Sequence, residues 1–239
     1  KAFLNMVSEM DMTKYDVTLL LLEEKGGFLK DVPKDVQVEV LENYQQIKNE
    51  IMEPPLKCVK KAVRLKKYLE AIGILFYHFM FKISNDRTSY YRFVLRRAKK
   101  RTNYDVAVAF AGPMEFITTY ILEKVEAKKK VQWVHFDISK NGTNINHAKH
   151  NYPRFDKIFV VSDEAKKILI EAIPGIKSIT ETKHNVVSEK MCLQQSKIGE
   201  TYDEYEGIKI LTVGRLYKEK GQDIIPDVAK QLKQEGYNF

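Results

Sequence analysis

Short apolar runs alternate with helical patterns along this chain, and this alternation restricts the possible folds more than any other feature. The run YDVTLLLLE at 15–23 is continuously apolar, as expected for a strand buried on both faces of a parallel sheet. Further short apolar runs predict strands at 36–42, 104–110, 131–136, 157–162 and 208–214. Helical patterns lie at 1–10, 114–128, 163–172 and 219–235. The chain is therefore predicted to be an α/β protein with βαβ units and a doubly wound, Rossmann-like parallel sheet.

One helix start is marked clearly. In VSDEAKKILIEAI, Ser162 precedes the helical pattern and acidic residues occupy its first turn. A serine hydroxyl at this place accepts a hydrogen bond from a free backbone N–H, and acidic side chains complement the helix dipole. Ser162 is thus predicted to be an N-cap and not a nucleophile, because no His–Asp pattern accompanies it.

The composition indicates a globular protein with a basic surface. Of the 239 residues, 44% are hydrophobic and 30% charged, which is enough to build a core, and the net charge is +8. An anionic partner is therefore expected. The only cysteines, Cys58 and Cys192, form no CxxC pair, which argues against a zinc site or a disulfide framework and favours the cytoplasm.

The domain organisation is read from a change in composition. The stretch SKIGETYDEYE at 196–206 is polar and acidic without an apolar period, and it is interpreted as a linker. Residues 1–195 would form an N-terminal α/β domain, and residues 207–239 would begin a second one. The chain opens within a helical pattern and closes on what reads as a new strand, so we expect it to be part of a longer protein.

The stretch ILTVGRLYKEKGQD at 210–223 has the features of a phosphate-binding loop. Gly214 lets a ligand approach the backbone where the predicted strand ends. The planar guanidinium of Arg215 matches phosphate oxygens, and Lys220 adds a positive charge near the next helix start. From the spacing alone, a surface arginine in water or in a salt bridge is the commoner interpretation.

This stretch closely resembles the start of the C-terminal domain of retaining glycosyltransferases with the GT-B architecture, in the glycosyltransferase family 4 group. The resemblance extends to three N-terminal landmarks in the same order, VQWVHFD, FDKIFVVSDEAKKIL and HNVVSEK, and to the opening KAFLNMVSEMDMTKYDVTLLLLEEKGGFL. It implies the GT-B fold and a retaining hexosyltransferase activity with a nucleotide-sugar as donor.

The resemblance also implies roles for particular residues. Arg215 and Lys220, beside Gly214, would bind the diphosphate of the donor and stabilise it as it leaves, which is electrostatic catalysis. These cations would replace a divalent ion, so neither a metal nor a cofactor is expected. His135 would face the reacting sugar as the catalytic histidine, with a merely packed histidine as the alternative.

Two further residues have weaker assignments, and two parts of the family pattern are absent. Asp137 could orient a substrate hydroxyl or lie at the surface as an ordinary carboxylate, and Asn185 is expected to have a structural or hinge role. The glycine-rich loop that would precede Lys1 and the glutamate pair that would follow Phe239 are missing from the chain. The chain alone is therefore expected to be inactive.

Residues 57–101 are strongly basic. They hold fourteen Lys or Arg against Glu70 and Asp86, a local net charge of +12, with aromatic residues interleaved. Such a segment can lie in a membrane interface, and this surface is predicted to contact the membrane. The alternative is that the apolar residues pack on the sheet and the charges are solvated. No nucleic-acid-binding motif is present, so no nucleic-acid partner is expected.

The function predicted from these features is transfer of a sugar from a nucleotide-sugar to a glycan or lipid-linked acceptor, with retention, in surface polysaccharide or glycolipid biosynthesis. The enzyme would be cytoplasmic and peripheral to the inner face of the cell membrane. One alternative is a non-catalytic basic α/β module that binds membrane or nucleic acid. The other is a dinucleotide-dependent oxidoreductase, against which the missing G-x-G-x-x-G argues.

Overall fold

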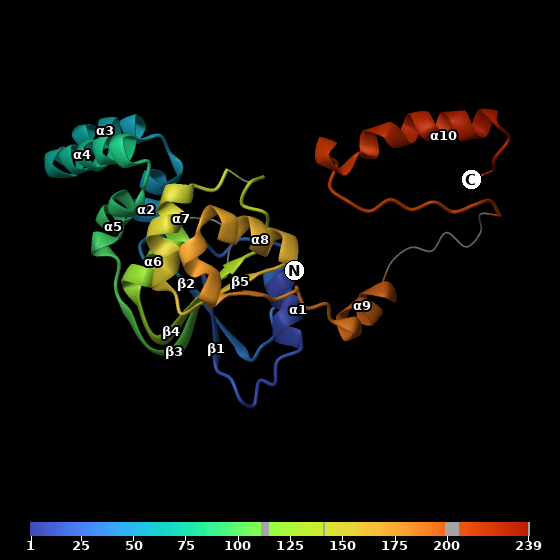
Figure 1. Ribbon diagram of the computed structural model, residues 1–239, viewed down its shortest axis with the longest axis horizontal. Coiled ribbons are helices and arrows are strands. Elements are labelled where there is room, and N and C mark those ends of the chain that lie inside the picture. Colours follow the sequence, from blue (N-terminus) through green and yellow to red (C-terminus); the bar gives the residue numbers. More distant parts are fainter. Residues whose placement is uncertain (111–114, 141, 199–205, 239) are drawn as a thin grey trace. The chain divides into compact units, whose positions relative to one another are not determined.

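Figure 1 shows the computed structural model of the chain, which describes residues 1–110, 115–140, 142–198 and 206–238. Contacts between residues divide the chain into two compact units, Lys1–Ser188 and Glu189–Phe239, called here the first and the second unit. The domain boundaries expected from the sequence stay a prediction. Residues 199–205, most of the expected linker, lie outside the described residues.

The described strands of the first unit all pair in parallel, as the alternation of strands and helices predicts. One sheet consists of β1 (Val17–Leu21) and β2 (Val36–Val40). The other sheet has four strands in the order β3 (Arg101–Ala109), β4 (Val125–Val134), β5 (Lys157–Val160) and β6 (Thr180–Thr182). The first unit is therefore an α/β structure, and its parallel sheets are compatible with a Rossmann-like fold.

Helices fill the connections between these strands. The α-helices of the first unit are α1 (Ala2–Ser8), α2 (Tyr44–Met52), α3 (Pro55–Arg64), α4 (Tyr68–Ser84), α5 (Thr88–Val94), α6 (Glu115–Lys124), α7 (Ile145–Asn151) and α8 (Asp163–Ala172). Short 3₁₀ helices are η1 (Leu29–Asp31), η2 (Leu95–Arg97), η3 (Tyr152–Arg154) and η4 (Pro174–Ile179). The N-cap prediction is confirmed, because the Ser162 hydroxyl accepts a hydrogen bond from the backbone N–H of Ala165 at 3.2 Å.

Strand β4 begins at Val125 and not at residue 131, and this corrects two predictions. The helical pattern expected at 114–128 ends at Lys124, and Met114 lies outside the described residues. The first half of β4 carries the charged run EAKKK and is mostly exposed, yet its backbone pairs with β3 from Arg101 onward. Backbone pairing does not require apolar side chains, so a search for apolar runs does not detect the charged half of this strand.

The core lies where the second half of β4 meets β5 and the helices around them. Val134, Ile158 and Val160 are almost fully buried on the paired strands. From the helices, Phe116 packs against Tyr91 and Tyr120, with ring centroids 5.9 and 6.3 Å apart. Burial of these aromatic rings fixes α5 and α6 against the sheet.

Residues 57–101 form a helical layer and no strand until β3 begins. Helices α3 and α4 run side by side at the edge of the first unit, beyond α2 and α5 (Figure 1). Helix α4 buries little, chiefly Ala71 and Ile74. At Gly73 a Cβ atom would overlap the ring of Phe93, so α4 approaches α5 closely at a position where any side chain would force the ring to move.

The second unit contains α9 (Glu189–Ser196), η5 (Lys218–Lys220), η6 (Gln222–Ile224) and α10 (Ile225–Gln234). The strand expected at 208–214 is wrong for the structure, because these residues pair with no other strand in the described part of the unit. Leu211 and Val213 are more than four-fifths exposed. An apolar run forms a strand only where another strand pairs with it, and the local sequence does not determine whether such a partner is present.

The helix expected at 219–235 is also shorter than predicted. Gly221 adopts a positive φ of 64° and separates the turn η5 from η6. Regular α-helix begins at Ile225, with Pro226 in its first turn, where a missing N–H leaves no hydrogen bond unmade. Within the described part of the chain, no helix combines the length and the apolar character needed to cross a membrane.

Candidate functional site

The carboxyl ends of the four parallel strands β3 to β6 meet at one edge of the sheet, which is where ligands of open α/β sheets bind. Phe110 follows β3, His135 follows β4, and His184 and Asn185 follow β6. We call this edge the strand-end site. Its composition is aromatic and polar.

His135 is held between two aromatic rings. The Trp133 ring lies parallel to the imidazole at a centroid distance of 5.7 Å, and the Phe110 ring lies edge-on at 4.5 Å. Burial lowers the pKa of His135, and this outweighs the backbone of Phe110 and the side chain of Asn185, which favour the charged form. The imidazole is therefore neutral at neutral pH, with one nitrogen able to accept a hydrogen bond and the other able to donate one.

The Nε2 atom of His135 is buried and has no hydrogen-bond partner among the described residues. The side chain of Asn185 approaches the ring but does not complete a hydrogen bond to this nitrogen. The indole Nε1 of Trp133 is likewise buried, and no described residue forms a hydrogen bond with it. Buried polar atoms are normally paired, so two unpaired nitrogens at one sheet edge indicate a place for an external polar group.

The sequence singles out His135 but not its neighbours. Phe110 and Asn185 come to the histidine from the ends of β3 and β6, so the contact depends on the sheet and not on local spacing. The sequence suggests a structural or hinge role for Asn185, and the structure places it beside the catalytic candidate. The signal that could have found all three is the position of each one just after a strand.

Asp137 builds the turn that follows His135. Its Oδ1 accepts hydrogen bonds from the backbone N–H and the hydroxyl of Ser139, at 2.8 and 2.7 Å. These bonds, with Lys140 near Oδ2 at 3.4 Å, lower the pKa of Asp137. One carboxylate oxygen is thus occupied by the turn, and the expected contact of Asp137 with a substrate hydroxyl stays a prediction.

The predicted phosphate-binding residues Gly214, Arg215 and Lys220 belong to the second unit. Two backbone hydrogen bonds, Tyr217 N–H to Arg215 O at 2.7 Å and Lys220 N–H to Tyr217 O at 2.8 Å, fold this segment into successive tight turns. The two cationic side chains are exposed, and neither has an ion-pair partner within the described ranges. Their meeting with His135 stays a prediction, since it involves both units.

Gly214 is exposed, with the side chain of Gln222 beside it, and the expected approach of a ligand to its backbone stays a prediction. A Cβ atom there would lie 3.3 Å from Nε2 of Gln222, whose side chain also reaches the Thr212 hydroxyl at 3.3 Å. The Arg215 guanidinium lies over the Tyr217 ring at 5.2 Å from its centroid. The loop is therefore organised by its own side chains, with both charges turned to solvent.

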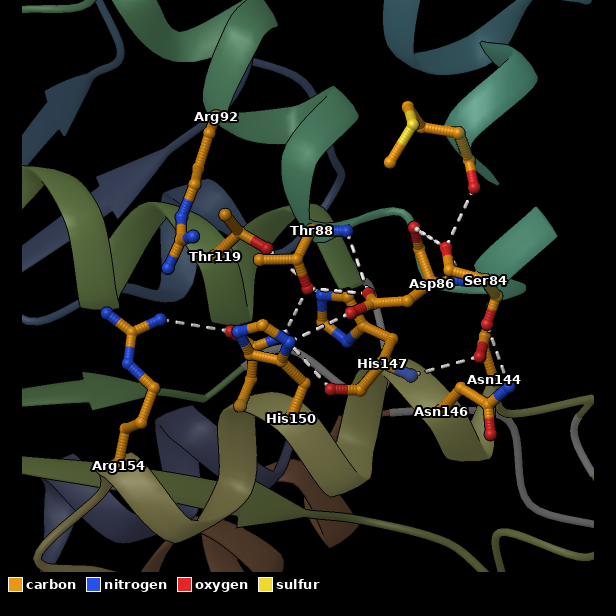
Figure 2. A network of polar contacts seen from close by, with 12 residues as sticks. Ser84, Asp86, Thr88, Arg92, Thr119, Asn144, Asn146, His147, His150 and Arg154 are labelled. Carbon is orange, nitrogen blue, oxygen red and sulfur yellow. Dashed lines mark hydrogen bonds and ion pairs between the residues drawn. The ribbon is translucent and has the colours of Figure 1, made fainter. Parts of the chain in front are cut away.

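A second group of polar residues joins α5, α6 and α7 inside the first unit (Figure 2). The Asp86 carboxylate accepts hydrogen bonds from the backbone N–H and the hydroxyl of Thr88, at 2.8 and 2.6 Å, and lies 3.1 Å from Nδ1 of His150. The amide of Asn151 donates to the Thr88 hydroxyl at 2.6 Å. The sequence did not predict this network, because its members come from distant parts of the chain.

His147 lies at the centre of this network and is almost fully buried. Its Nε2 is 3.0 Å from the Thr119 hydroxyl, and its backbone N–H donates to Oδ1 of Asn144 at 3.0 Å. Burial lowers its pKa to about 4. Since these polar groups are already paired with one another, the network ties helices together and is not available to a ligand.

Two pockets lie around α2. One of about 260 Å³ is bounded by α2, α3, α4 and η2, and its charged lining consists of Glu42, Glu50, Lys61, Lys67, Glu70, Arg96 and Arg97. Burial, and then the negative charge of Glu70, raise the pKa of Glu50 to about 7. The other pocket, about 450 Å³ and more open, lies at the carboxyl ends of β1 and β2.

Comparison with known proteins adds no family. No protein-family model matches the chain, and no curated protein matches it significantly. Among the residues that the structure describes, no group of three or more His, Cys, Asp or Glu side chains is placed to hold a metal ion.

Proposed function

We propose that the chain carries the acceptor side and the leading edge of the donor side of a retaining GT-B glycosyltransferase, with its reaction centre at the strand-end site. The observation that carries this proposal is the buried Nε2 of His135, which has no hydrogen-bond partner in the described ranges and lies at the carboxyl edge of a parallel sheet. The finer Rossmann-like, GT-B form of the fold is part of the proposal.

His135 would act on the sugar while neutral. Its lowered pKa keeps the ring uncharged, so Nε2 can exchange a hydrogen bond with a sugar hydroxyl without bringing a buried positive charge close to the reacting carbon. The Trp133 and Phe110 rings hold the imidazole from two sides and limit its rotation. This preorganisation is the contribution that the first unit makes to catalysis.

Arg215 and Lys220 would bind the diphosphate of the nucleotide-sugar. Both charges are solvent-facing on a tightly turned segment, and no described carboxylate neutralises either of them. As the bond between the sugar and the phosphate breaks, negative charge grows on the leaving diphosphate, and these cations stabilise it. No step needs a metal ion, and the acceptor is a glycan or a lipid-linked saccharide in polysaccharide or glycolipid synthesis in the cytoplasm.

The test measures sugar transfer by the full protein from UDP- and GDP-sugars to a lipid extract, together with UDP binding. Arg215→Ala should weaken binding of the diphosphate by about 1.5–3 kcal/mol, tenfold or more, and reduce turnover. His135→Ala should reduce turnover with UDP affinity unchanged. Lys209→Ala, an exposed cation on the same segment, is the matched control. Unchanged turnover in both Arg215→Ala and His135→Ala would refute the proposal.

A non-catalytic membrane-binding module is the second candidate, and the exposed apolar face of α4 favours it. Vesicle binding, UDP binding and sugar transfer, measured on one preparation, distinguish the two functions. A protein that binds vesicles but neither binds UDP nor transfers a sugar is the module and not the enzyme.

A further inference from the structure

Helix α4 exposes a continuous apolar stripe. Large side chains recur every three or four residues along its outer face, with exposed fractions from 40% to 87%. They are Tyr68, Leu69, Ile72, Leu75, Phe76, Phe79, Met80 and Ile83. Residues at this spacing lie on one side of a helix, so they form a single surface along its whole length. We call this surface the α4 stripe.

Helix α4 differs from an ordinary surface helix in which of its faces is buried. The residues it buries are small or few, Ala71 and Ile74, with Gly73 against the ring of Phe93. A helix of a soluble domain turns its large apolar side chains inward, whereas α4 turns most of them outward. A large exposed apolar patch of this kind marks a binding surface.

Twelve of the fourteen positive charges of residues 57–101 fall into two groups that the sequence could not separate. The other two are Arg87, which lies over the Phe81 ring, and Lys100, which is exposed. Arg92, Arg96, Arg97, Lys99 and Arg101 form ion pairs with carboxylates of the first unit. The cations of α3, of the turn after it and of the end of α4 have no ion-pair partner among the described residues, and they are Lys57, Lys60, Lys61, Arg64, Lys66, Lys67 and Lys82. The unpaired charges thus lie on the same helical hairpin as the α4 stripe.

We propose that the α3–α4 hairpin docks on the surface of an anionic lipid bilayer. The α4 stripe enters the boundary between headgroups and acyl chains, with the helix axis in the plane of the membrane, and the unpaired cations of α3 contact lipid phosphates. Apolar burial and charge attraction then act together, which is the combination that retains peripheral proteins at membranes. The five ion-paired basic residues between Arg92 and Arg101 stabilise the fold instead.

Charge decides between this occupant and two others. A second copy of the chain would bring seven unpaired cations against another seven, so self-association through this face is opposed by repulsion. Nucleic acid would neutralise the cations but leave the α4 stripe in water. An anionic bilayer satisfies both the charges and the apolar side chains.

The test is flotation of the protein with phosphatidylcholine vesicles that contain either no or about 30% phosphatidylglycerol. The stripe variant, Phe76→Ser with Phe79→Ser, should lose about tenfold or more of its partitioning into anionic vesicles, because two ring side chains no longer enter the bilayer. The charge variant, Lys60→Gln with Arg64→Gln, should lose a similar factor at low salt and less at high salt.

Matched controls keep the result interpretable. Leu193→Ser with Ile198→Ser removes two exposed apolar side chains from the second unit, and Lys149→Gln with Lys167→Gln removes two exposed charges of the first unit. Both controls should partition like the unaltered protein. Since every substituted side chain is exposed, circular dichroism should show an unchanged fold.

Two outcomes would overturn the proposal. One is equal flotation of the stripe variant and the unaltered protein. The other is a dimer in sedimentation that the stripe variant dissociates, without any binding to vesicles, which would assign the surface to a second copy. The assay uses no nucleotide and no residue of the strand-end site, so its result is independent of the proposed glycosyltransferase activity.

Discussion

Protonation of His147 should destabilise the first unit at mildly acidic pH. The ring is almost fully buried, paired with the Thr119 hydroxyl at 3.0 Å, and set edge-on to the Tyr91 ring at 6.3 Å. Burial is the main reason that its pKa falls to about 4, and His150 and Arg87 add to it while Asp86 opposes it. A charged imidazole in this place would lack the water that stabilises it in the unfolded chain.

The size of the effect follows from the difference between two pKa values. The folded value of about 4 lies below the unfolded value of about 6.5, so the unfolded chain binds the proton first as the pH falls. His147 therefore leaves the free energy of unfolding unchanged above about pH 6.5 and lowers it as the pH falls toward about 4. The loss is about 2 kcal/mol at about pH 5 and about 3 kcal/mol at a pH below both pKa values.

The assay compares urea unfolding of the unaltered protein and His147→Gln at about pH 7 and about pH 5. Trp133, the only tryptophan of the chain, is buried in β4 and reports on the first unit. The loss of unfolding free energy between the two pH values should be about 2 kcal/mol smaller in the variant, because glutamine does not titrate. His150→Gln, which alters the more exposed histidine of the same network, is the control.

Other titrating groups affect both proteins equally, so only the difference between them tests the argument. An equal loss of stability in His147→Gln and in the unaltered protein would contradict it. So would a pKa near 6.5 for the His147 ring in a nuclear magnetic resonance titration of the folded protein.

Three further predictions concern the fold. Gly73→Ala should destabilise the contact between α4 and Phe93 because the new methyl group overlaps the ring, and Phe93→Leu in the same chain should restore part of the loss in urea unfolding. Ser162→Ala should lower the unfolding free energy by about 1 kcal/mol through loss of the N-cap of α8, and Ser162→Asp should not. Burial raises the pKa of Glu50 to about 7, so the unfolded chain loses this proton at a lower pH than the folded chain does. Glu50 should therefore lower the free energy of unfolding as the pH rises from about 4.5 to about 7. Glu50→Gln should abolish this contribution in a pH series of denaturation curves.

The sequence predicted those elements whose residues carry their own signal. The run that contains Ile158 and Val160 became β5, in which these two alternate residues are fully buried. The cap at Ser162 is a contact between neighbours in the chain. The charged half of β4 was missed because pairing with β3 involves backbone atoms only. The run at 208–214 has strand propensity, but it pairs with no strand in the described second unit.

The candidate site was predictable to the same extent. His135 follows a recognisable strand, so its place at the carboxyl edge could be expected from local sequence. Its contacts with Phe110 and Asn185 could not, because they depend on the order of strands in the sheet. The hydrogen bond between Asn151 and Thr88 spans 63 residues of sequence, and no local pattern announces such a pair.

The narrow attachment of α4 makes the α3–α4 hairpin vulnerable in the absence of its partner. Ala71 and Ile74 are the buried residues of α4, and most of its other side chains are exposed, so the hairpin should open more readily than the sheet. The turn between the two helices contains Lys66 and Lys67, both exposed, with Lys66 at a positive φ of 58°. Trypsin should therefore cut the purified protein first at this turn, and bound vesicles should protect it.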